Sequence, residues 1–306
     1  MDRTKFMENF GTQNKDANAT NINTISMKSI LTLAILATAA VSTLLADPIP
    51  ESFRQNGWFI GAQAYTFKEF TTFEAIAKTK EAGGNIVEIY PGQKMKTDSD
   101  VKIHHTMAEE SIVELLAECE RQGIRLVNYG VVGANNADEV NKIMAFAKRL
   151  GLYAVCTEST EQIVAWEKAA IETDVKVAFH EHGGSMSNPK YKVWNPLYIR
   201  GVVESRDERV GACADLGHWC TSNLKPVECL RILDGRIVSC HLKDKASFGQ
   251  AEVVTVGTGV VDVKACLEEL KKQKFDGHIS VEHENHWNDS VPHVKAAIDY
   301  VKANPK

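Results

Sequence analysis

The chain contains 306 residues, of which 44% are hydrophobic and 25% are charged, and these shares are typical of a folded globular protein. The length allows one large domain or two ordinary ones. The 35 Lys and Arg residues stand against 40 Asp and Glu residues, which gives a net charge of −5. This acidic balance excludes the broad positive surface that sequence-independent nucleic-acid binding needs, so we expect no nucleic-acid partner.

The N-terminus differs in composition from the rest of the chain. Residues 1–26 are polar and rich in Asn and Thr, and Met27 and Lys28 then lead into an apolar run over 30–46. A basic start, an apolar stretch and small residues near Ala46 are typical of a secretory signal peptide. A membrane anchor is the alternative, because this run of 17 residues approaches the length that spans a bilayer. A lipoprotein is disfavoured, because no Cys lies at the junction.

These features predict how the chain is organised. We expect translation to start at Met27 and the signal peptide to be cleaved near Ala46. Residues 1–46 are then a polar leader plus signal peptide, and 47–306 form the folded domain. The protein is expected to be exported, periplasmic or secreted, and to meet a membrane only through its export signal.

Seven cysteines are scattered along the chain without a CxxC or other close spacing. Most of them fall at apolar positions of expected helices and strands. An odd number of such residues argues against a disulfide framework, although a single pair is left open. Stability is therefore expected to come from a large apolar core.

Short β-rich runs alternate with amphipathic helical stretches throughout 47–306. Eight strands are predicted, over 59–64, 86–90, 125–129, 153–157, 176–180, 211–215, 237–241 and 278–282. Between them, apolar residues at 112, 115, 116 and 119 and at 263, 266, 267 and 270 follow the spacing of a helix face.

Boundary residues support this alternation. Thr71 and Glu74 have the spacing of a capping box, and Pro196 and Pro226 stand at helix starts. Four glycines are expected at helix ends, namely Gly83, Gly123, Gly151 and Gly235. Strand ends recur about every 31 residues, the length of a βα unit, so the sequence predicts a single-domain (β/α)8 TIM barrel. A doubly wound open sheet is the competing fold, but no GxGxxG follows the first strand.

The carboxyl ends of the last four predicted strands carry residues that bind metals. The four ends read Phe179-His180-Glu181-His182, Ala214-Asp215-Leu216-Gly217-His218, Cys240-His241-Leu242-Lys243-Asp244 and Val281-Glu282-His283-Glu284. Active sites of TIM barrels lie at this end of the strands. Residues two apart on a strand share a face, so His180 is paired with His182, His241 with Lys243 and Glu282 with Glu284. A mixed imidazole and carboxylate set predicts one divalent metal ion, either Mn, Co, Zn or Mg.

Three of these motifs resemble those of the xylose-isomerase-like TIM-barrel superfamily, which includes sugar isomerases, ketose 3-epimerases, inosose dehydratases and the endonuclease IV group. The motifs are Asp215-x-x-His218, His241-Leu-Lys-Asp244 and Ile279-Ser-Val-Glu282, and the resemblance covers about residues 57–303. It implies that Asp215, His241 and Glu282 are metal ligands. In the epimerase branch the fifth strand supplies a Glu as fourth ligand and base, whereas His180 stands at that position here. The fourth ligand is thus expected to be His180, with Glu158 as the alternative.

Other strand-end residues are candidates for proton transfer and substrate contact. Glu282 is the expected proton-transfer group, together with Lys243 or Glu158. Residues expected to contact the substrate are Glu88, His182, His218, Trp219 and Glu284. The stretches 183–194 and 245–261 are long enough to be functional loops.

The expected reaction is removal of a proton from a carbon next to a carbonyl, through an enediolate, in a sugar isomerase or epimerase. A lyase that eliminates a group from an oxidised sugar, such as a 3-keto-glycoside, is the alternative. An apurinic endonuclease is disfavoured because Glu88 and Tyr129 stand where that branch has His residues, and because the chain is acidic. A sugar-binding barrel without catalysis is a further alternative. The substrate is expected to be a small unphosphorylated sugar, and a homo-oligomer is possible.

Overall fold

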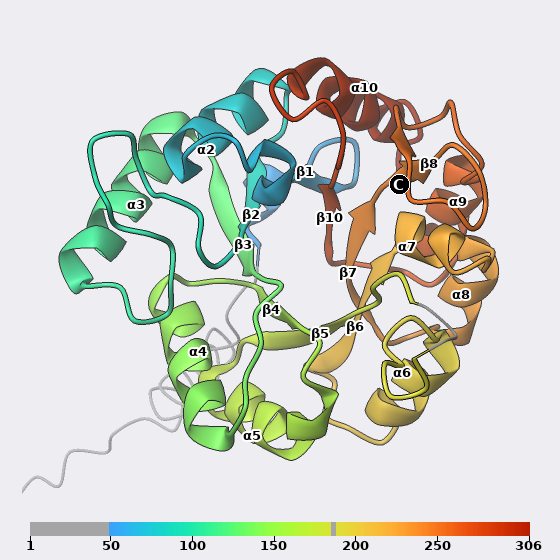
Figure 1. The fold of residues 1–306 in the computed structure, drawn as a ribbon, viewed down its shortest axis with the longest axis horizontal. Coiled ribbons are helices and arrows are strands. Elements are labelled where there is room, and N and C mark those ends of the chain that lie inside the picture. Colours follow the sequence, from blue (N-terminus) through green and yellow to red (C-terminus); the bar gives the residue numbers. More distant parts are fainter. Residues whose placement is uncertain (1–48, 185–187) are drawn as a thin grey trace, which may run out of the picture. The chain divides into compact units, whose positions relative to one another are not determined.

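A computed structural model of the chain describes residues 49–184 and 188–306. The predicted polar leader and signal peptide, residues 1–46, lie outside the described residues. Eight parallel strands close into a barrel in the order β1-β10-β7-β6-β5-β4-β3-β2 (Figure 1). They are β1 (Phe59–Gln63), β2 (Ile86–Ile89), β3 (Arg125–Tyr129), β4 (Ala154–Thr157), β5 (Lys176–His180), β6 (Val210–Asp215), β7 (Ile237–Leu242) and β10 (His278–Val281). The predicted (β/α)8 barrel is therefore confirmed.

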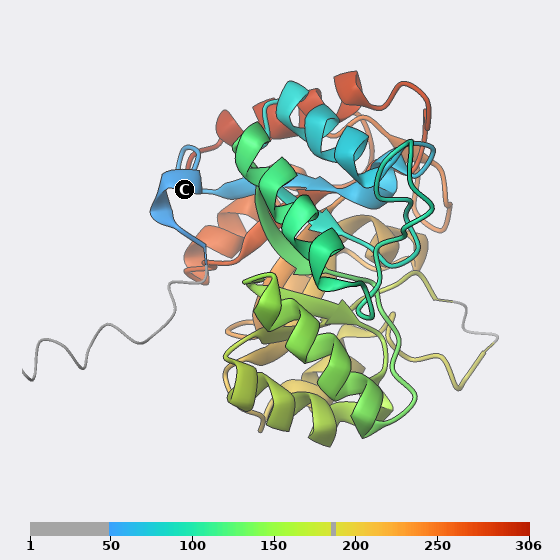
Figure 2. The ribbon, with the colours of Figure 1, turned by 90° about the vertical axis from the view of Figure 1, so that its left-hand side faces the viewer.

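Helices form a ring outside the barrel and cover its strands (Figures 1 and 2). They are α2 (Thr72–Glu81), α3 (Glu109–Gln122), α4 (Ala137–Arg149), α5 (Ile163–Thr173), α6 (Pro196–Val203), α7 (Leu216–Thr221), α8 (Pro226–Ile232), α9 (Val263–Lys272) and α10 (Val291–Lys302), with short 3-10 helices η1 (Glu51–Phe53), η2 (Ala64–Phe67) and η3 (Thr160–Gln162). None of the helices in the described part of the chain has the length and apolar character needed to cross a membrane.

The boundary signals in the sequence act as predicted. The Thr71 hydroxyl accepts from the backbone of Glu74, whose carboxylate accepts from the backbone of Thr71, so the capping box at the start of α2 is complete. Gly123 ends α3 in the left-handed conformation, with φ of 62°. The other predicted glycine stops, Gly83, Gly151 and Gly235, also have positive φ.

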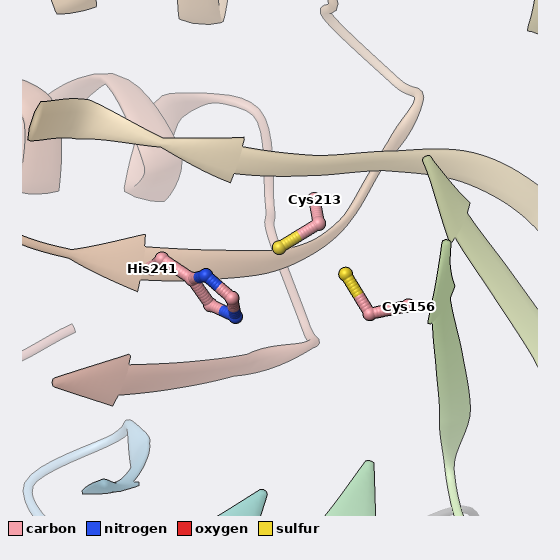
Figure 3. Close-up of side chains that lie close together, drawn as sticks. All are labelled: Cys156, Cys213 and His241. Carbon is pink, nitrogen blue, oxygen red and sulfur yellow. The ribbon is translucent and has the colours of Figure 1, made fainter. Parts of the chain in front are cut away.

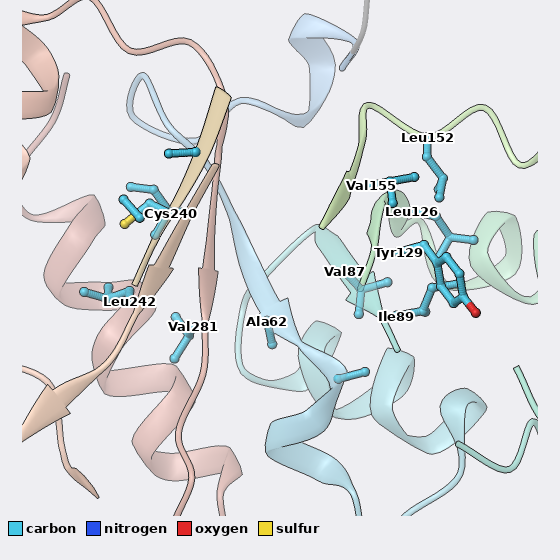
Figure 4. Packing of buried hydrophobic residues seen from close by; sticks show 14 of the residues in the cluster. Ala62, Val87, Ile89, Leu126, Tyr129, Leu152, Val155, Cys240, Leu242 and Val281 are labelled. Atoms are coloured by element: carbon cyan, nitrogen blue, oxygen red, sulfur yellow. The ribbon is translucent and has the colours of Figure 1, made fainter. Parts of the chain in front are cut away.

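Alternation along the strands divides the apolar core into two layers. Residues on the outer strand faces, among them Val87, Leu126 and Val281, pack against the helices (Figure 4). A second cluster, which includes Phe59, Ile86 and Ala178, occupies the alternate strand positions. At the carboxyl ends of the strands these alternate positions carry polar residues instead. The apolar filling of the barrel interior therefore ends below the polar residues at the carboxyl ends of the strands.

All seven cysteines are buried and free. Cys156 on β4 and Cys213 on β6 direct their sulfur atoms toward each other and toward the ring of His241 (Figure 3). Burial raises the pKa of the Cys156 thiol well above its ordinary value. These side chains fill the interior layer of the barrel beside His241.

Candidate metal centre and active site

Four side chains from four neighbouring strands converge at the carboxyl end of the barrel. They are His180 at the end of β5, Asp215 at the end of β6, His241 on β7 and Glu282 directly after β10. One ligand atom of each lies within 4.8 Å of one ligand atom of every other. Asp215 Oδ2 is 3.6 Å from both His180 Nε2 and His241 Nδ1, and Glu282 Oε2 is 3.2 Å from His241 Nδ1. The structure thus brings together the four residues that the sequence suggested as ligands.

The hydrogen bonding of these four residues fits a metal ion. Within residues 49–184 and 188–306, His180 Nε2, Asp215 Oδ2, His241 Nδ1 and Glu282 Oε2 are buried and make no hydrogen bond of ordinary geometry, although Lys243 Nζ lies within 3.2 Å of both carboxylate oxygens. Buried polar atoms without partners are costly, so the two imidazole nitrogens in particular call for a partner at this point. Two imidazole nitrogens and two carboxylate oxygens are donors that suit a divalent ion such as Zn, Mn or Co.

The remaining polar atoms of the ligands are held by neighbouring groups. His241 Nε2 lies 3.0 Å from Glu88 Oε2, and His180 Nδ1 lies 3.1 Å from Glu158 Oε1. Asp215 Oδ1 accepts from the backbone of His218 at 2.8 Å, because Asp215 is the N-cap of α7. Contacts of this kind orient metal ligands and set which imidazole nitrogen faces the ion.

The sequence led us to expect that Glu88 contacts the substrate, but the structure places Glu88 against His241 instead. It is fully buried beside His241 and is absent from the lining of the pocket. Glu88 lies at the predicted level of the barrel, near the carboxyl end of its strand. Its carboxylate contacts the ring of His241 and does not line the pocket. Its carboxylate orients that ring.

Glu158 contacts the ligand His180 through one oxygen and accepts from the Tyr191 hydroxyl through the other, at 2.8 Å. Burial raises its pKa, but the hydrogen bond and the charge of His180 outweigh this and hold the pKa below its ordinary value. Glu158 lies outside the group of four converging ligand atoms. His180, rather than Glu158, thus belongs to the group of four side chains that could hold an ion. Tyr191 lies inside the predicted loop 183–194, and no motif in the sequence indicated that it would contact Glu158.

Lys243 is buried among three carboxylates. Its Nζ donates to Glu284 at 2.8 Å, lies 3.0 Å from Glu282 Oε2 and 3.2 Å from Asp215 Oδ2, and contacts His218 Nε2 at 3.1 Å. Burial lowers the pKa of Lys243, but the three carboxylates outweigh burial and raise it. In this arrangement the charge of Lys243 balances the three carboxylates, and its role as a base stays a prediction.

Gly217 makes room for Lys243. A Cβ atom at Gly217 would lie 2.6 to 2.8 Å from the Cβ, Cγ and Cδ atoms of the lysine side chain. Only glycine at this position lets α7 pass so close to β7. The glycine of the Asp-Leu-Gly-His motif thus has a packing reason that the sequence alone did not show.

A pocket opens above the four ligands. Its lining includes His180 and Glu282 from the ligand set, and Glu158, His182, His218 and Glu284 around them, together with Gln63, Tyr65, Tyr90, Pro91 and Val131. The rings of His182 and His218 lie 4.2 Å apart, and those of Tyr65 and Tyr90 lie edge to face at 5.3 Å. The predicted contact residues His182, His218 and Glu284 are placed where a bound molecule would meet them.

Trp219 is placed differently from the prediction. It is fully buried and absent from the pocket lining, and its Nε1 donates to Glu181 Oε2 at 2.9 Å. The short helix α7 turns Trp219 into the barrel wall while its neighbour His218 reaches the pocket. Trp219 is therefore a packing residue, and Glu181 faces away from the site as the period-two pattern predicted.

Burial raises the pKa of Glu181 to about 8 from an ordinary value of 4.5. Stability from this neutral carboxyl is fully present below pH 4.5 and is lost as the pH rises toward 8. Glu181→Gln cannot ionise, so between pH 5 and 8 the variant should gain about 1.4 kcal/mol of unfolding free energy per pH unit relative to wild type. Urea unfolding at several pH values measures this difference. Parallel pH profiles for the two proteins would contradict it.

Asp244, the last residue of the His-Leu-Lys-Asp motif, holds the loop that follows it. The loop starts with a short antiparallel pair, β8 (Asp244–Lys245) and β9 (Val253–Val254). The buried Asp244 carboxylate accepts from the backbone N–H groups of Gly257 and Gly259 at 2.9 Å and Val261 at 3.0 Å. Asp244 thus holds the C-terminal part of the functional loop expected over 245–261 through three backbone groups.

Asp244→Ala should lower the unfolding free energy by about 2–3 kcal/mol, because several backbone donors lose an ionised acceptor. Thermal and urea unfolding measure this loss. Asp262→Ala is the matched control, because Asp262 caps α9 by accepting from the backbone of Ala265 alone. That loss is expected to be about 1 kcal/mol. Equal losses for the two variants would show that Asp244 does not hold the loop.

Comparisons with known proteins agree with this fold and place the chain in a family. The family model for the xylose isomerase-like TIM barrel matches residues 76–304. No curated protein matches the sequence. An uncharacterised protein from Parabacteroides distasonis is 27% identical over 80% of this chain and 98% of its own, with a TM-score of 0.66.

Two further solved structures share the fold. D-allulose 3-epimerase from Methylomonas sp. is 14% identical over 82% of this chain and 99% of its own, with a TM-score of 0.62. A protein from Bacillus anthracis described as the probable 3-DHS dehydratase is 13% identical over 80% of this chain and 98% of its own, with a TM-score of 0.58. The family match, which spans most of the barrel, is the stronger finding: this chain belongs to the xylose isomerase-like TIM-barrel family.

Proposed function

We propose that the protein is a metal-dependent sugar isomerase or epimerase that moves a proton on a carbon next to a carbonyl. The observation that carries this proposal is the convergence of two buried imidazoles and two buried carboxylates next to a pocket lined by further carboxylates. A divalent ion held by His180, Asp215, His241 and Glu282 would polarise the carbonyl and stabilise an enediolate oxygen.

Glu282 is the group best placed to take the proton. It lines the pocket and is ionised, because Lys243 and His241 outweigh burial and hold its pKa well below its ordinary value. An ionised carboxylate within reach of the substrate is the form that accepts a proton. Glu158, directly after β4 at the pocket wall, is the second carboxylate that could return a proton. Lys243 acts by positioning Glu282.

The pocket favours a neutral polyol. Glu158, Glu282 and Glu284 are among its lining residues, and within 49–184 and 188–306 no Arg or Lys lines it, so a phosphate group would meet like charge rather than a partner. Gln63, His182 and His218 add groups that can hydrogen-bond hydroxyls. An unphosphorylated sugar also suits an exported enzyme, and we propose export on the basis of the signal pattern. Fractionation of cells expressing the full chain tests the location.

The test of the reaction is exchange with solvent. The purified protein is first analysed for bound metal and then incubated with unphosphorylated ketoses in deuterium oxide, followed by NMR. We expect deuterium to enter the carbon next to the carbonyl, with a second isomer or epimer appearing, and both signals to disappear after chelation. Metal-loaded protein that incorporates no deuterium with any ketose would overturn the proposal and support a non-catalytic sugar-binding barrel.

A lyase acting on an oxidised sugar is the second candidate, because His180 replaces the carboxylate base expected on the fifth strand. The pocket instead offers the close pair His182 and His218. Burial holds the pKa of His218 well below its ordinary value, so this ring is neutral and carries a donor for a leaving group. The fold shared with a dehydratase is compatible with elimination. Release of the aglycone from a 3-keto-glycoside, without isomerisation of free ketoses, would favour this candidate.

A further inference from the structure

A second cluster of potential metal ligands lies apart from the four-residue centre. His283 follows Glu282 at the end of β10, His286 lies in the next loop, and His293 is on α10. One ring nitrogen of each lies within 4.8 Å of a ring nitrogen of both others. His283 is buried, His293 is half-buried and His286 is exposed. The cluster of three imidazoles thus extends from the buried His283 to the protein surface at His286.

The spacing within this cluster suits a tetrahedral metal. His283 Nε2 and His286 Nδ1 are 3.1 Å apart. Two nitrogens bound to one tetrahedral zinc at 2.0–2.1 Å would be separated by roughly 3.3 Å. The three rings are stacked with their planes within 16° of one another, so their lone pairs lie in nearly parallel planes, and the rings of His286 and His293 must turn before all three can meet one ion. The exposed ring of His286 can turn to direct its lone pair at a shared ion.

The hydroxyl of Thr255 orients the ring of His293, as second ring partners commonly orient metal-bound histidines. Thr255 Oγ1 lies 2.6 Å from His293 Nδ1, which leaves His293 Nε2 for another partner. An oxygen that accepts from the second ring nitrogen sets the tautomer of metal-bound histidines. Thr255 is on the loop that Asp244 fixes to the barrel, so three separate chain segments meet at the cluster.

We infer that His283, His286 and His293 form a second metal site, which takes a borderline ion of the Zn²⁺ class. A set of imidazole ligands selects Zn, Cu or Ni over Mg, Ca or Mn, which prefer oxygen. His283 and the ligand Glu282 are adjacent in sequence and therefore point to opposite sides of the strand extension. The backbone N–H of His283 is held by the Thr66 hydroxyl at 2.9 Å. The second site therefore has its own ligands and its own supporting contacts.

An ion at this site would fix the rim of the pocket. Trp287 follows His286 and packs edge to face on Tyr65, with ring centroids 5.9 Å apart. Lys68 Nζ lies 3.7 Å from the centre of the Trp287 ring. Tyr65 lines the pocket. Tying His286 to α10 and β10 would hold the Trp287–Tyr65 contact in place, which gives the second ion a structural role.

Zinc stoichiometry of the full chain, prepared without a histidine tag, tests this inference. Metal-free protein is dialysed against Zn²⁺, and bound zinc is counted by mass spectrometry. We expect two ions per chain in wild type and one in His286→Ala/His293→Ala, which leaves His283 beside Glu282 untouched. Asp215→Asn, which alters the first centre, should keep the ion at the histidine cluster. This outcome is independent of catalysis, so it separates the second site from the proposed reaction.

The matched control is His104→Ala/His105→Ala, which removes another close pair of histidine rings, 4.1 Å apart. This variant should keep two ions. Co²⁺ absorption gives a second readout, and the intensity of its visible bands should fall in the His286/His293 variant and not in the control. Equal zinc content in wild type and the His286/His293 variant would overturn the inference. So would an equal loss in the variant and the control.

Discussion

Glu282→Gln is expected to lower kcat by about 10²- to 10⁴-fold, measured as deuterium exchange or isomer formation at saturating metal. The substitution preserves shape and leaves an oxygen that can still approach the ligand group, but it removes the carboxylate that accepts the proton. Glu282 lines the pocket and is kept ionised by Lys243 and His241. Substrate KM should change much less than kcat, because the lost interaction belongs to the proton-transfer step.

The control for this variant is Glu110→Gln, at an exposed position on α3. It makes the same chemical change far from the site and should leave kcat unchanged. Bound metal is measured in both proteins, since a variant that had merely lost its ion would mimic loss of the base. Wild-type turnover by folded, metal-loaded Glu282→Gln would show that Glu282 is not the proton-transfer group.

Lys243→Met is expected to lower the unfolding free energy of the metal-free protein by about 3–5 kcal/mol, because it leaves buried carboxylates without their cation. Lys243 Nζ lies within 3.2 Å of Asp215, Glu282 and Glu284. A divalent ion would offset part of that unbalanced charge. The thermal midpoint of the variant should therefore rise more on addition of Mn²⁺ or Zn²⁺ than that of wild type.

Lys245→Met is the matched control for Lys243→Met. Both lysines are 1% exposed and they are two residues apart, but Lys245 Nζ donates to the carbonyl of Ala251 at 2.9 Å. Removing it leaves one carbonyl unpaired and should cost about 1 kcal/mol. Similar losses for the two variants would mean that volume, rather than charge balance, decides the stability of Lys243→Met.

The barrel could be predicted because its signals are local. β3 and β5 begin and end at the predicted residues, and the other barrel strands differ from the prediction by a residue or so at an end. The pair β8 and β9 had no signal, since two-residue strands show no periodicity. That pair depends on Asp244, which accepts from backbone groups up to 17 residues away. Contacts over such separations leave no pattern in a window of sequence.

The sequence by itself determined the fold, the level of the site and the residues that converge there. Parallel strands of one barrel end at one rim, so strand ends and period-two alternation placed His180, Asp215, His241 and Glu282 at one level, and the family resemblance implied Asp215, His241 and Glu282 as ligands. Only the tertiary structure decided what their neighbours do. Charge, burial and access to the pocket are set by groups from other strands.

Three residues show this division. Three carboxylates surround Lys243, Glu88 lies against His241 and outside the pocket lining, and Trp219 is buried and contacts Glu181. Each was placed correctly near the carboxyl ends of the strands, but its contacts could not be predicted. Position along the chain fixes the height of a side chain in a barrel, whereas its pKa and exposure depend on atoms that are distant in sequence and close in space.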